Sequence, residues 1–206
     1  MTGLARFNGC PVQAWSRHGE LTLGAAIDRC DVLLSAISMG GVPETVRKIQ
    51  ALGLSPHTVI VSATKGLDAA TLQTPSHIWH DAFPQNPIVV LSGPNLAKEI
   101  EDGLPGATVV ASVQATAAQR VRDVFASDRF RVYTNADPLG TELGGTLKKC
   151  HCHCGGGVRR PEAGHQRQIG PDHPRPAGGG AHWNPPGGTA GYLLWAVGVG
   201  GYAGHL

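Results

Sequence analysis

A continuous apolar run of strand length constrains the fold of this chain more than any other feature. Asp31 to Ser38 reads Asp-Val-Leu-Leu-Ser-Ala-Ile-Ser, without regular alternation of apolar and polar residues. Such a run is typical of a strand that is buried on both faces of a parallel sheet, because helices then cover both faces. The sequence therefore predicts an α/β fold.

The rest of residues 12–137 repeats this pattern. Val42 to Leu52 has apolar residues at helical spacing, with Pro43 tolerated in the first turn and Gly53 closing the helix. Further strands are predicted at 12–15, 58–63, 88–91, 107–111 and 131–133, and further helices at 72–83, 96–102 and 115–126. This alternation predicts a doubly wound parallel sheet of the Rossmann type, with right-handed crossovers.

Length and charge narrow the class of protein. At 206 residues the chain has room for one full domain and part of a second. A net charge of +2 is too small to indicate a nucleic-acid surface or a membrane-steering field. No apolar run reaches the roughly 18 residues that span a bilayer, and the start lacks the apolar core of a signal peptide. We therefore expect a cytoplasmic protein.

The composition changes near Cys150. Of 29 glycines, 15 lie in residues 150–206, together with six of the ten histidines and no lysine. Three of the five cysteines lie in Cys150-His-Cys-His-Cys154. Thiolate and imidazole are zinc ligands, so a metal-binding module stays open as an alternative. Zinc sites usually space their ligands two to four residues apart, with a second pair further on, so no metal site is predicted here.

Three loops at the ends of predicted strands carry the candidate chemistry, because ligands of doubly wound sheets collect there. Lys65 puts a cation beside the turn at Gly66, and Ser92-Gly-Pro-Asn95 opens a helix whose amides can hold an anion. Arg17 and His18 follow the strand that meets the adenine ribose, where a basic residue suits a 2′-phosphate. Each has an ordinary alternative: a solvated loop charge, plain turn chemistry or a surface arginine.

Five segments, taken in order, resemble the NAD(P)-dependent glycerol-3-phosphate dehydrogenases in the short form found in cyanobacteria. They are Val12-Gln-Ala-Trp-Ser-Arg17, Ser62-Ala-Thr-Lys-Gly-Leu67, Leu91-Ser-Gly-Pro-Asn-Leu-Ala-Lys-Glu99, Gly103-Leu-Pro-Gly-Ala107 and Thr141-Glu-Leu-Gly-Gly-Thr-Leu-Lys148. The order of the segments carries the resemblance as much as their residues do.

The resemblance implies reduction of dihydroxyacetone phosphate to sn-glycerol 3-phosphate with NADPH or NADH, a supply to glycerophospholipid synthesis, and a homodimer. It implies that Lys65 contacts both cofactor and substrate, and that Gly93 and Asn95 contact the substrate. Ala97 would contact the cofactor, and Lys148 would transfer the proton beside the carbonyl. A cation there stabilises the developing alkoxide. The other interpretation of Lys148 is a helix-surface charge.

The family opens with a strand and a G-x-G-x-x-G turn that holds the pyrophosphate, and no such pattern stands before Arg17. Met1 falls inside the helix that follows this turn. We therefore expect an open N-terminus, with a central place in the sheet left empty and the main anchor of the cofactor lost.

A change of reading frame is expected after Lys148. There the family's apolar helix is replaced by Lys149-Cys-His-Cys-His-Cys-Gly155. Codons for this run, read from the second base, permit Asn-Val-Ile-Ala-Ile-Ala. The same offset turns residues 192–203 into a permitted Thr-Phe-Tyr-Gly-Leu-Ser-Gly-Leu-Gly-Asp-Met-Leu, which looks like the family's glycine-rich substrate loop. One extra adenine in the codons of Lys148 and Lys149 explains both, and we expect little or no activity of the polypeptide as written.

Together these observations predict three regions. Residues 1–137 form an incomplete Rossmann-type NAD(P)-binding domain, and residues 138–149 begin a helical substrate domain that is otherwise absent. Residues 150–206 are an out-of-frame Gly/Pro/His-rich tail that we expect to be disordered. Small molecules are the expected partners, without nucleic acid or membrane. Another β-hydroxyacid-type dehydrogenase stays open as an alternative.

Overall fold

The computed structural model describes residues 10–16, 19–94, 100, 102, 104–154 and 192–197, and only the main chain of 148–154 and 192–197. The strands are β1 (Val12–Trp15), β2 (Cys30–Ala36), β3 (Val59–Ser62), β4 (Ile88–Ser92), β5 (Gly106–Ala111), β6 (Phe130–Asn135) and β7 (Tyr192–Val197). The helices are α2 (Leu23–Ile27), α3 (Val42–Leu52), α4 (Pro75–Ala82), α6 (Ala115–Phe125) and α7 (Pro138–Cys154), with a 3₁₀ turn, η1, at Met39–Gly41. Within these ranges, no helix combines the length and apolarity needed to cross a membrane.

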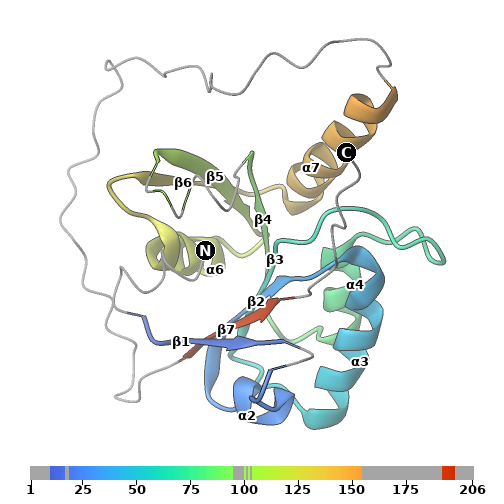
Figure 1. The fold of residues 1–206 in the computed structure, drawn as a ribbon, viewed down its shortest axis with the longest axis vertical. Helices are drawn as coiled ribbons and strands as arrows, with labels where there is room; N and C mark the ends of the chain where they lie inside the picture. The colour runs from blue at the N-terminus through green and yellow to red at the C-terminus, as the bar shows by residue number, and fades with distance from the viewer. Residues whose placement is uncertain are drawn as a thin grey trace.

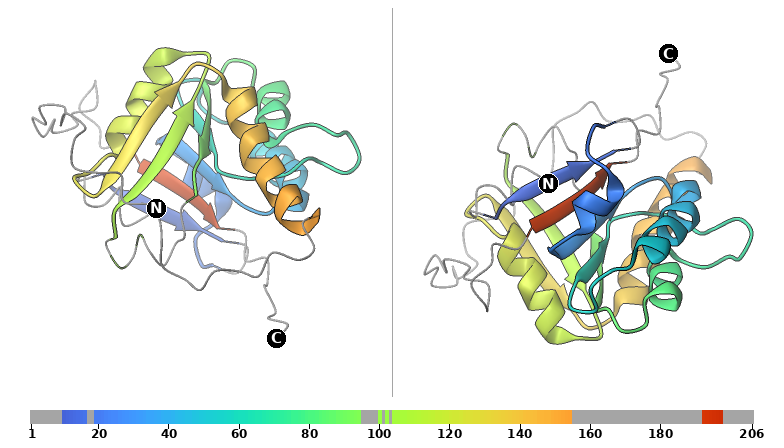
Figure 2. Two further views of the ribbon diagram at one scale, coloured as in Figure 1. Left: turned by 90° about the horizontal axis from the view of Figure 1, so that it is seen from above. Right: turned by 90° about the horizontal axis from the view of Figure 1, so that it is seen from below.

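The strands form one sheet in the order β1-β7-β2-β3-β4-β5-β6 (Figure 1). Helix α6 packs on one face of the sheet, and α2, α3 and α4 pack on the other (Figure 2). Central strands feed both layers: Leu34 and Val61 lie in the cluster under α6, whereas Leu33 and Ile60 lie in the cluster under α3 and α4. Each such buried side chain stabilises the fold by about 1.5–3 kcal/mol. The α/β, Rossmann-type fold class is therefore confirmed.

Helix α3 has the bounds that its sequence predicts. Pro43 lies in its first turn, and Gly53 ends it with φ of +80°, a left-handed conformation that favours glycine. Strand β1 also has its predicted bounds, and β2 to β6 and α6 lie within a few residues of theirs.

Three helix predictions fare differently. The helix predicted at 72–83 begins only at Pro75, because Leu72 has φ of +57° and the Thr74 side chain caps the helix by accepting from the His77 amide. Helix α2 is not predicted, since its five residues are too short for a periodic pattern. Most of the helix predicted at 96–102 lies outside the described residues.

Strand β5 is the exception in the predicted parallel sheet. It pairs with β4 in the antiparallel sense, whereas every other pair of neighbouring strands is parallel within the described ranges. The chain leaves β4 at its carboxyl end and enters β5 at the same edge of the sheet. Strands β5 and β6 therefore run opposite to β4. Helix α7, which follows β6, then returns alongside β4 and β5.

Strand β7 corrects the prediction of an empty central place. Tyr192–Val197 lies parallel between β1 and β2 and is paired with both. Helix α7 also continues past Lys149 to Cys154. These two segments belong to the tail that was expected to be disordered. Its remaining residues lie outside the described ranges, so the three-region division stays a prediction.

Candidate functional site

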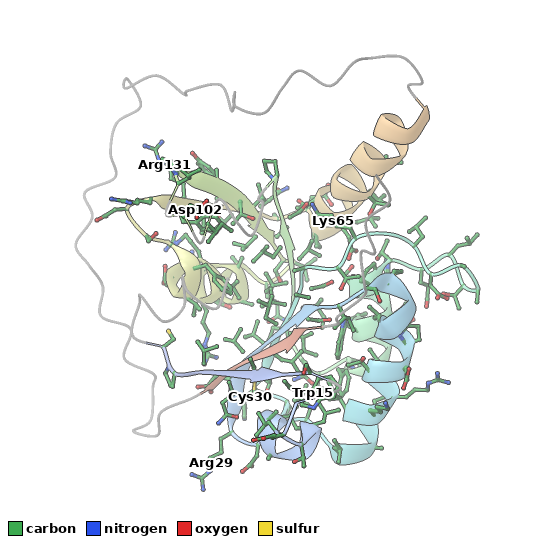
Figure 3. All side chains as sticks on the ribbon, viewed as in Figure 1. Trp15, Arg29, Cys30, Lys65, Asp102 and Arg131 are labelled. Atoms are coloured by element: carbon green, nitrogen blue, oxygen red, sulfur yellow. The ribbon has the colours of Figure 1, made fainter. Side chains whose placement is uncertain are left out.

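The candidate site lies at the carboxyl edge of β3 and β4, where the two loops that follow these strands meet the side of α7. β3 ends at Ser62 and is followed by the turn that carries Lys65, while β4 ends at Ser92 and is followed by Gly93. In a parallel sheet the carboxyl ends of neighbouring strands lie side by side, which brings the two loops together. Figure 3 shows Lys65 beside α7.

Lys65 is the cation at the centre of this edge. Its Nζ donates a hydrogen bond of 3.1 Å to the carbonyl oxygen of Gly93, so the amine is held between the β3 and β4 loops. Its side chain is half-buried, and α7 approaches it at Gly145. A Cβ on residue 145 would make an ordinary contact of 3.6 Å with Lys65 Cε but would lie 2.6 Å from Ser92 Oγ, so any larger residue would force the Ser92 side chain to shift.

Thr146 ties α7 to the Lys65 turn. Its hydroxyl accepts a hydrogen bond of 3.1 Å from the amide of Gly66 and donates one of 3.1 Å to the carbonyl of Glu142. Gly66 has φ of +122°, a conformation that side chains other than glycine rarely adopt. The hydrogen bond therefore fixes the position of α7 relative to the turn at Gly66.

Glu142 anchors the same helix on α4. Its side chain is 2% exposed, and its carboxylate accepts hydrogen bonds from the amide of Ser76 at 3.1 Å and from the Ser76 hydroxyl. Ser76 is in the first turn of α4, where amides have no partner within the helix and the dipole favours a negative charge. The Glu142 carboxylate accepts from a free amide and places a negative charge at the start of α4, although it lies 66 residues away in the sequence.

The loop that follows Lys65 is shaped by Asp68. Its carboxylate accepts from the hydroxyl of Thr71 at 2.8 Å and from the amide of Thr71 at 3.0 Å. These hydrogen bonds, the hydroxyl's first, hold the pKa of Asp68 below its ordinary value. The Asp68 carboxylate is thus bound within its own loop, by Thr71.

The structure brings together two of the site residues predicted from the sequence, Lys65 and Gly93. Lys148 lies in α7 two residues after Thr146, on a part of the helix whose side chains are not described. The other predicted positions, Arg17, His18, Asn95 and Ala97, lie outside the described residues. Their roles remain predictions.

The sequence predictions missed Ser92, Glu142, Gly145 and Thr146 as individual positions, although all four lie within the segments that carry the resemblance. The signal for Gly145 is its place in a Gly-Gly pair inside a helix, where glycine is costly unless another group approaches closely. They also missed β7. Its signal is an apolar run followed directly by Gly198-Val-Gly-Gly-Tyr-Ala203, which has the G-x-G-x-x-A spacing of dinucleotide-binding turns. Residues 198–203 lie outside the described part.

Among the described side chains, no three His, Cys, Asp or Glu residues come together as a metal site would need. The side chains of Cys150 to Cys154 are not described. The metal-binding alternative for this run therefore stays untested.

Comparison with known families identifies the larger part of the chain. The sequence profile of the family described as "NAD-dependent glycerol-3-phosphate dehydrogenase N-terminus" matches residues 8–118. A glycerol-3-phosphate dehydrogenase [NAD(P)+] of Trichormus variabilis is 58% identical over 148 residues, which are 72% of this chain and 48% of that protein. The enzyme of the same name from Acaryochloris marina is 59% identical over 145 residues, 70% of this chain and 47% of that protein. The chain thus spans about half the length of these relatives.

Solved structures agree on the fold. The glycerol-3-phosphate dehydrogenase of Coxiella burnetii superposes with a TM-score of 0.54 at 28% identity, covering 60% of this chain and 38% of that one. The Plasmodium falciparum enzyme gives a TM-score of 0.59 at 19% identity, covering 62% and 36%, a likeness of fold alone.

Proposed function

Because the chain belongs to the NAD-dependent glycerol-3-phosphate dehydrogenase family, we propose that its site serves the interconversion of dihydroxyacetone phosphate and sn-glycerol 3-phosphate with NADPH or NADH. The observation that carries the proposal is the Lys65 amine, fixed on the Gly93 carbonyl at the carboxyl edge and packed against Gly145. A cation held there by both loops suits an anionic, oxygen-rich substrate.

Lys65 supplies the positive charge that holds the triose phosphate, while Gly93 and Asn95 position it. Lys148 gives or takes the proton at the carbonyl oxygen, since a cation at that oxygen stabilises the alkoxide. Thr146 supports this arrangement, because its hydrogen bond to the Gly66 amide sets the position of α7 two residues before Lys148. The nicotinamide supplies the hydride when it is bound.

The sheet offers a fitting place for the dinucleotide at the carboxyl ends of β7 and β2, where Val197 pairs with Ala36. From this point β1 lies on one side and β2, β3 and β4 follow on the other. Doubly wound sheets bind nucleotides at such a switch point. Arg17, His18 and Ala97 are the proposed cofactor contacts, with the adenine ribose at Arg17 and His18.

Two measurements on the full chain test the proposal. NADPH fluorescence reports cofactor binding, and calorimetry with dihydroxyacetone phosphate reports substrate binding. We expect both ligands to bind, and Lys65→Ala to weaken substrate binding at least about tenfold, since it removes a hydrogen-bonded cation. Lys48→Ala, which removes an exposed lysine of α3 that pairs with Glu44, is the matched control and should bind as the parent does. A chain that binds neither ligand contradicts the proposal.

Turnover separates Lys148 from its neighbour. We expect slow oxidation of NADPH by dihydroxyacetone phosphate, abolished in Lys148→Ala and unchanged in Lys149→Ala. An equal loss of turnover in both variants would indicate that the two lysines stabilise the helix and that Lys148 does not transfer a proton.

We further propose a cytoplasmic protein that serves glycerophospholipid synthesis and acts on small molecules, without nucleic acid or membrane. The change of frame after Lys148 remains our explanation for the composition of residues 150–206. Sequencing the coding DNA through the codons of Lys148 and Lys149 tests it: synonymous codons that forbid the alternate register would refute it.

A further inference from the structure

Strand β7 is the link that joins β1 to the rest of the sheet. Val12–Trp15 of β1 pairs with residues 193–196, and Cys30–Ala36 of β2 pairs with residues 192–197. In the described ranges β1 has no other strand as a neighbour. The strands β1 and β2, which follow each other in the sequence, are therefore joined in the sheet by β7, which lies more than 150 residues later.

The place that β7 occupies lies in the interior of the sheet. On its β2 side, Leu33, Leu34 and Ser35 are each 0% exposed. On its β1 side, Val12 packs against the cluster under α6, and Trp15 packs against the cluster under α3. Main-chain amides and carbonyls left unpaired at such a depth cost about 1–3 kcal/mol each. Without an occupant, this place would leave two unpaired edges facing each other.

The place selects its occupant by direction, length and composition. Both flanking strands run parallel to β7, so an occupant must enter in one orientation. The pairing with β2 covers six residues. Tyr-Leu-Leu-Trp-Ala-Val consists largely of the β-branched, aromatic and aliphatic residues that interior parallel strands use. Residues 155–191 give more than the dozen or so residues that a parallel connection needs.

From this geometry we propose that the space between β1 and β2 is a strand-docking site, and that its occupant is the chain's own segment Tyr192–Val197. Recognition is by main-chain pairing on both sides, as in the addition of a peptide strand to a sheet. Residues 37–191 separate the segment from β2 along the chain, so it can leave the site and return to it without a covalent bond being broken. This proposal concerns assembly of the sheet and is independent of the proposed reaction.

Hydrogen exchange on the intact chain tests the pairing directly. We expect the amides of residues 193–196 and of β1 to exchange on the same slow timescale, because one opening event exposes both. The amides of β3 and β4 give the reference for the core. Exchange of residues 193–196 at the rate of an unstructured peptide, with β3 and β4 protected, would overturn the proposal.

A matched pair of variants separates strand docking from general stability. Leu194→Pro removes one amide donor and disfavours a central strand, whereas Leu194→Val keeps the amide and the strand preference. We expect exchange in β1 to accelerate roughly 100-fold in the proline variant, to remain slow in the valine variant, and to change little in β5 and β6. Unchanged protection of β1 in Leu194→Pro would contradict the docking.

A synthetic peptide of residues 190–199 completes the test. Added to Leu194→Pro, it should restore the slow exchange of β1, and the same peptide with proline at position 194 should not. Failure of the first peptide to restore protection counts against an exchangeable site. Light scattering on the parent chain identifies the occupant: a monomer that keeps β1 protected supports the chain's own segment, and an obligate dimer assigns the strand to a second copy instead.

Discussion

Gly145 controls the approach of α7 to the candidate site. In an exposed helix interior, replacing glycine by alanine stabilises a helix by up to about 1 kcal/mol. At position 145 the added Cβ would lie 2.6 Å from Ser92 Oγ, so the serine side chain at the end of β4 would have to leave its position. Steric overlap there outweighs helix propensity.

We expect Gly145→Ala to lower the free energy of unfolding by about 1–3 kcal/mol, the usual cost of an overpacked contact. Urea unfolding measures the change. The double variant with Ser92→Ala removes the opposing oxygen and should recover most of the loss.

Gly144→Ala is the matched control on the same helix. Residue 144 is exposed, and nothing lies within 4 Å of a Cβ placed there, so this variant should be neutral or up to about 1 kcal/mol more stable. A loss equal to that of Gly145→Ala would show that the contact with Ser92 is not what matters.

At the scale of elements, α7 is held by one buried carboxylate at Glu142 and one hydroxyl at Thr146. Both bonds join segments that are distant in sequence: Glu142 reaches the start of α4, and Thr146 reaches the turn after β3. In the part of α7 whose side chains are described, these are the hydrogen bonds that reach segments distant in sequence.

Glu142→Gln should destabilise the fold by about 1.5–3 kcal/mol, because an amide replaces a charged acceptor of two hydrogen bonds. Chemical denaturation measures this. Glu44→Gln is the control: Glu44 pairs with Lys48 at 2.7 Å with about half of each side chain exposed, and should cost only about 0.3–0.5 kcal/mol. Equal effects of the two changes would mean that the contact with Ser76 adds nothing to an ordinary surface charge.

The sequence predicts elements well where local chemistry decides them. Pro43 and Gly53 bound α3, and the apolar run around Leu33 marks a strand buried on both faces. It fails where the outcome depends on distant partners. The direction of β5 depends on the edge at which the chain re-enters the sheet, and the place of β7 depends on a gap elsewhere in the fold.

The candidate site follows the same division. Lys65 and the loop that holds Gly93 were singled out because they follow predicted strands, and the family resemblance gave both residues their roles. Glu142 and Thr146 were not, because their partners, Ser76 and Gly66, lie 66 and 80 residues away and no local pattern announces such pairs.

On the scale of the whole molecule, helices cover both faces of the sheet, and two of the exposed leucines lie together on α7. Leu139 and Leu147 of α7 are 43% and 62% exposed, two helical turns apart on one side of the helix, with the half-buried Leu143 between them. A row of exposed leucines on one helix favours association between molecules.

The double variant Leu139→Gln/Leu147→Gln should therefore aggregate more slowly on heating, followed by light scattering, with a change in unfolding free energy below roughly 0.5 kcal/mol. Leu52→Gln is the control, since Leu52 is 52% exposed on α3, away from this row. Equal slowing by the control would refute a role for the α7 row.

The position of β7 also sets the order in which the molecule can be made. A ribosome that has finished β1 and β2 must still synthesise residues 37–191 before the strand between them exists. Until then the place between β1 and β2 has no strand to fill it. Pairing of strands that are so far apart in the sequence is also slow once β7 has been made. During synthesis there is thus an interval in which an incomplete sheet is exposed to chaperones, proteases and neighbouring chains.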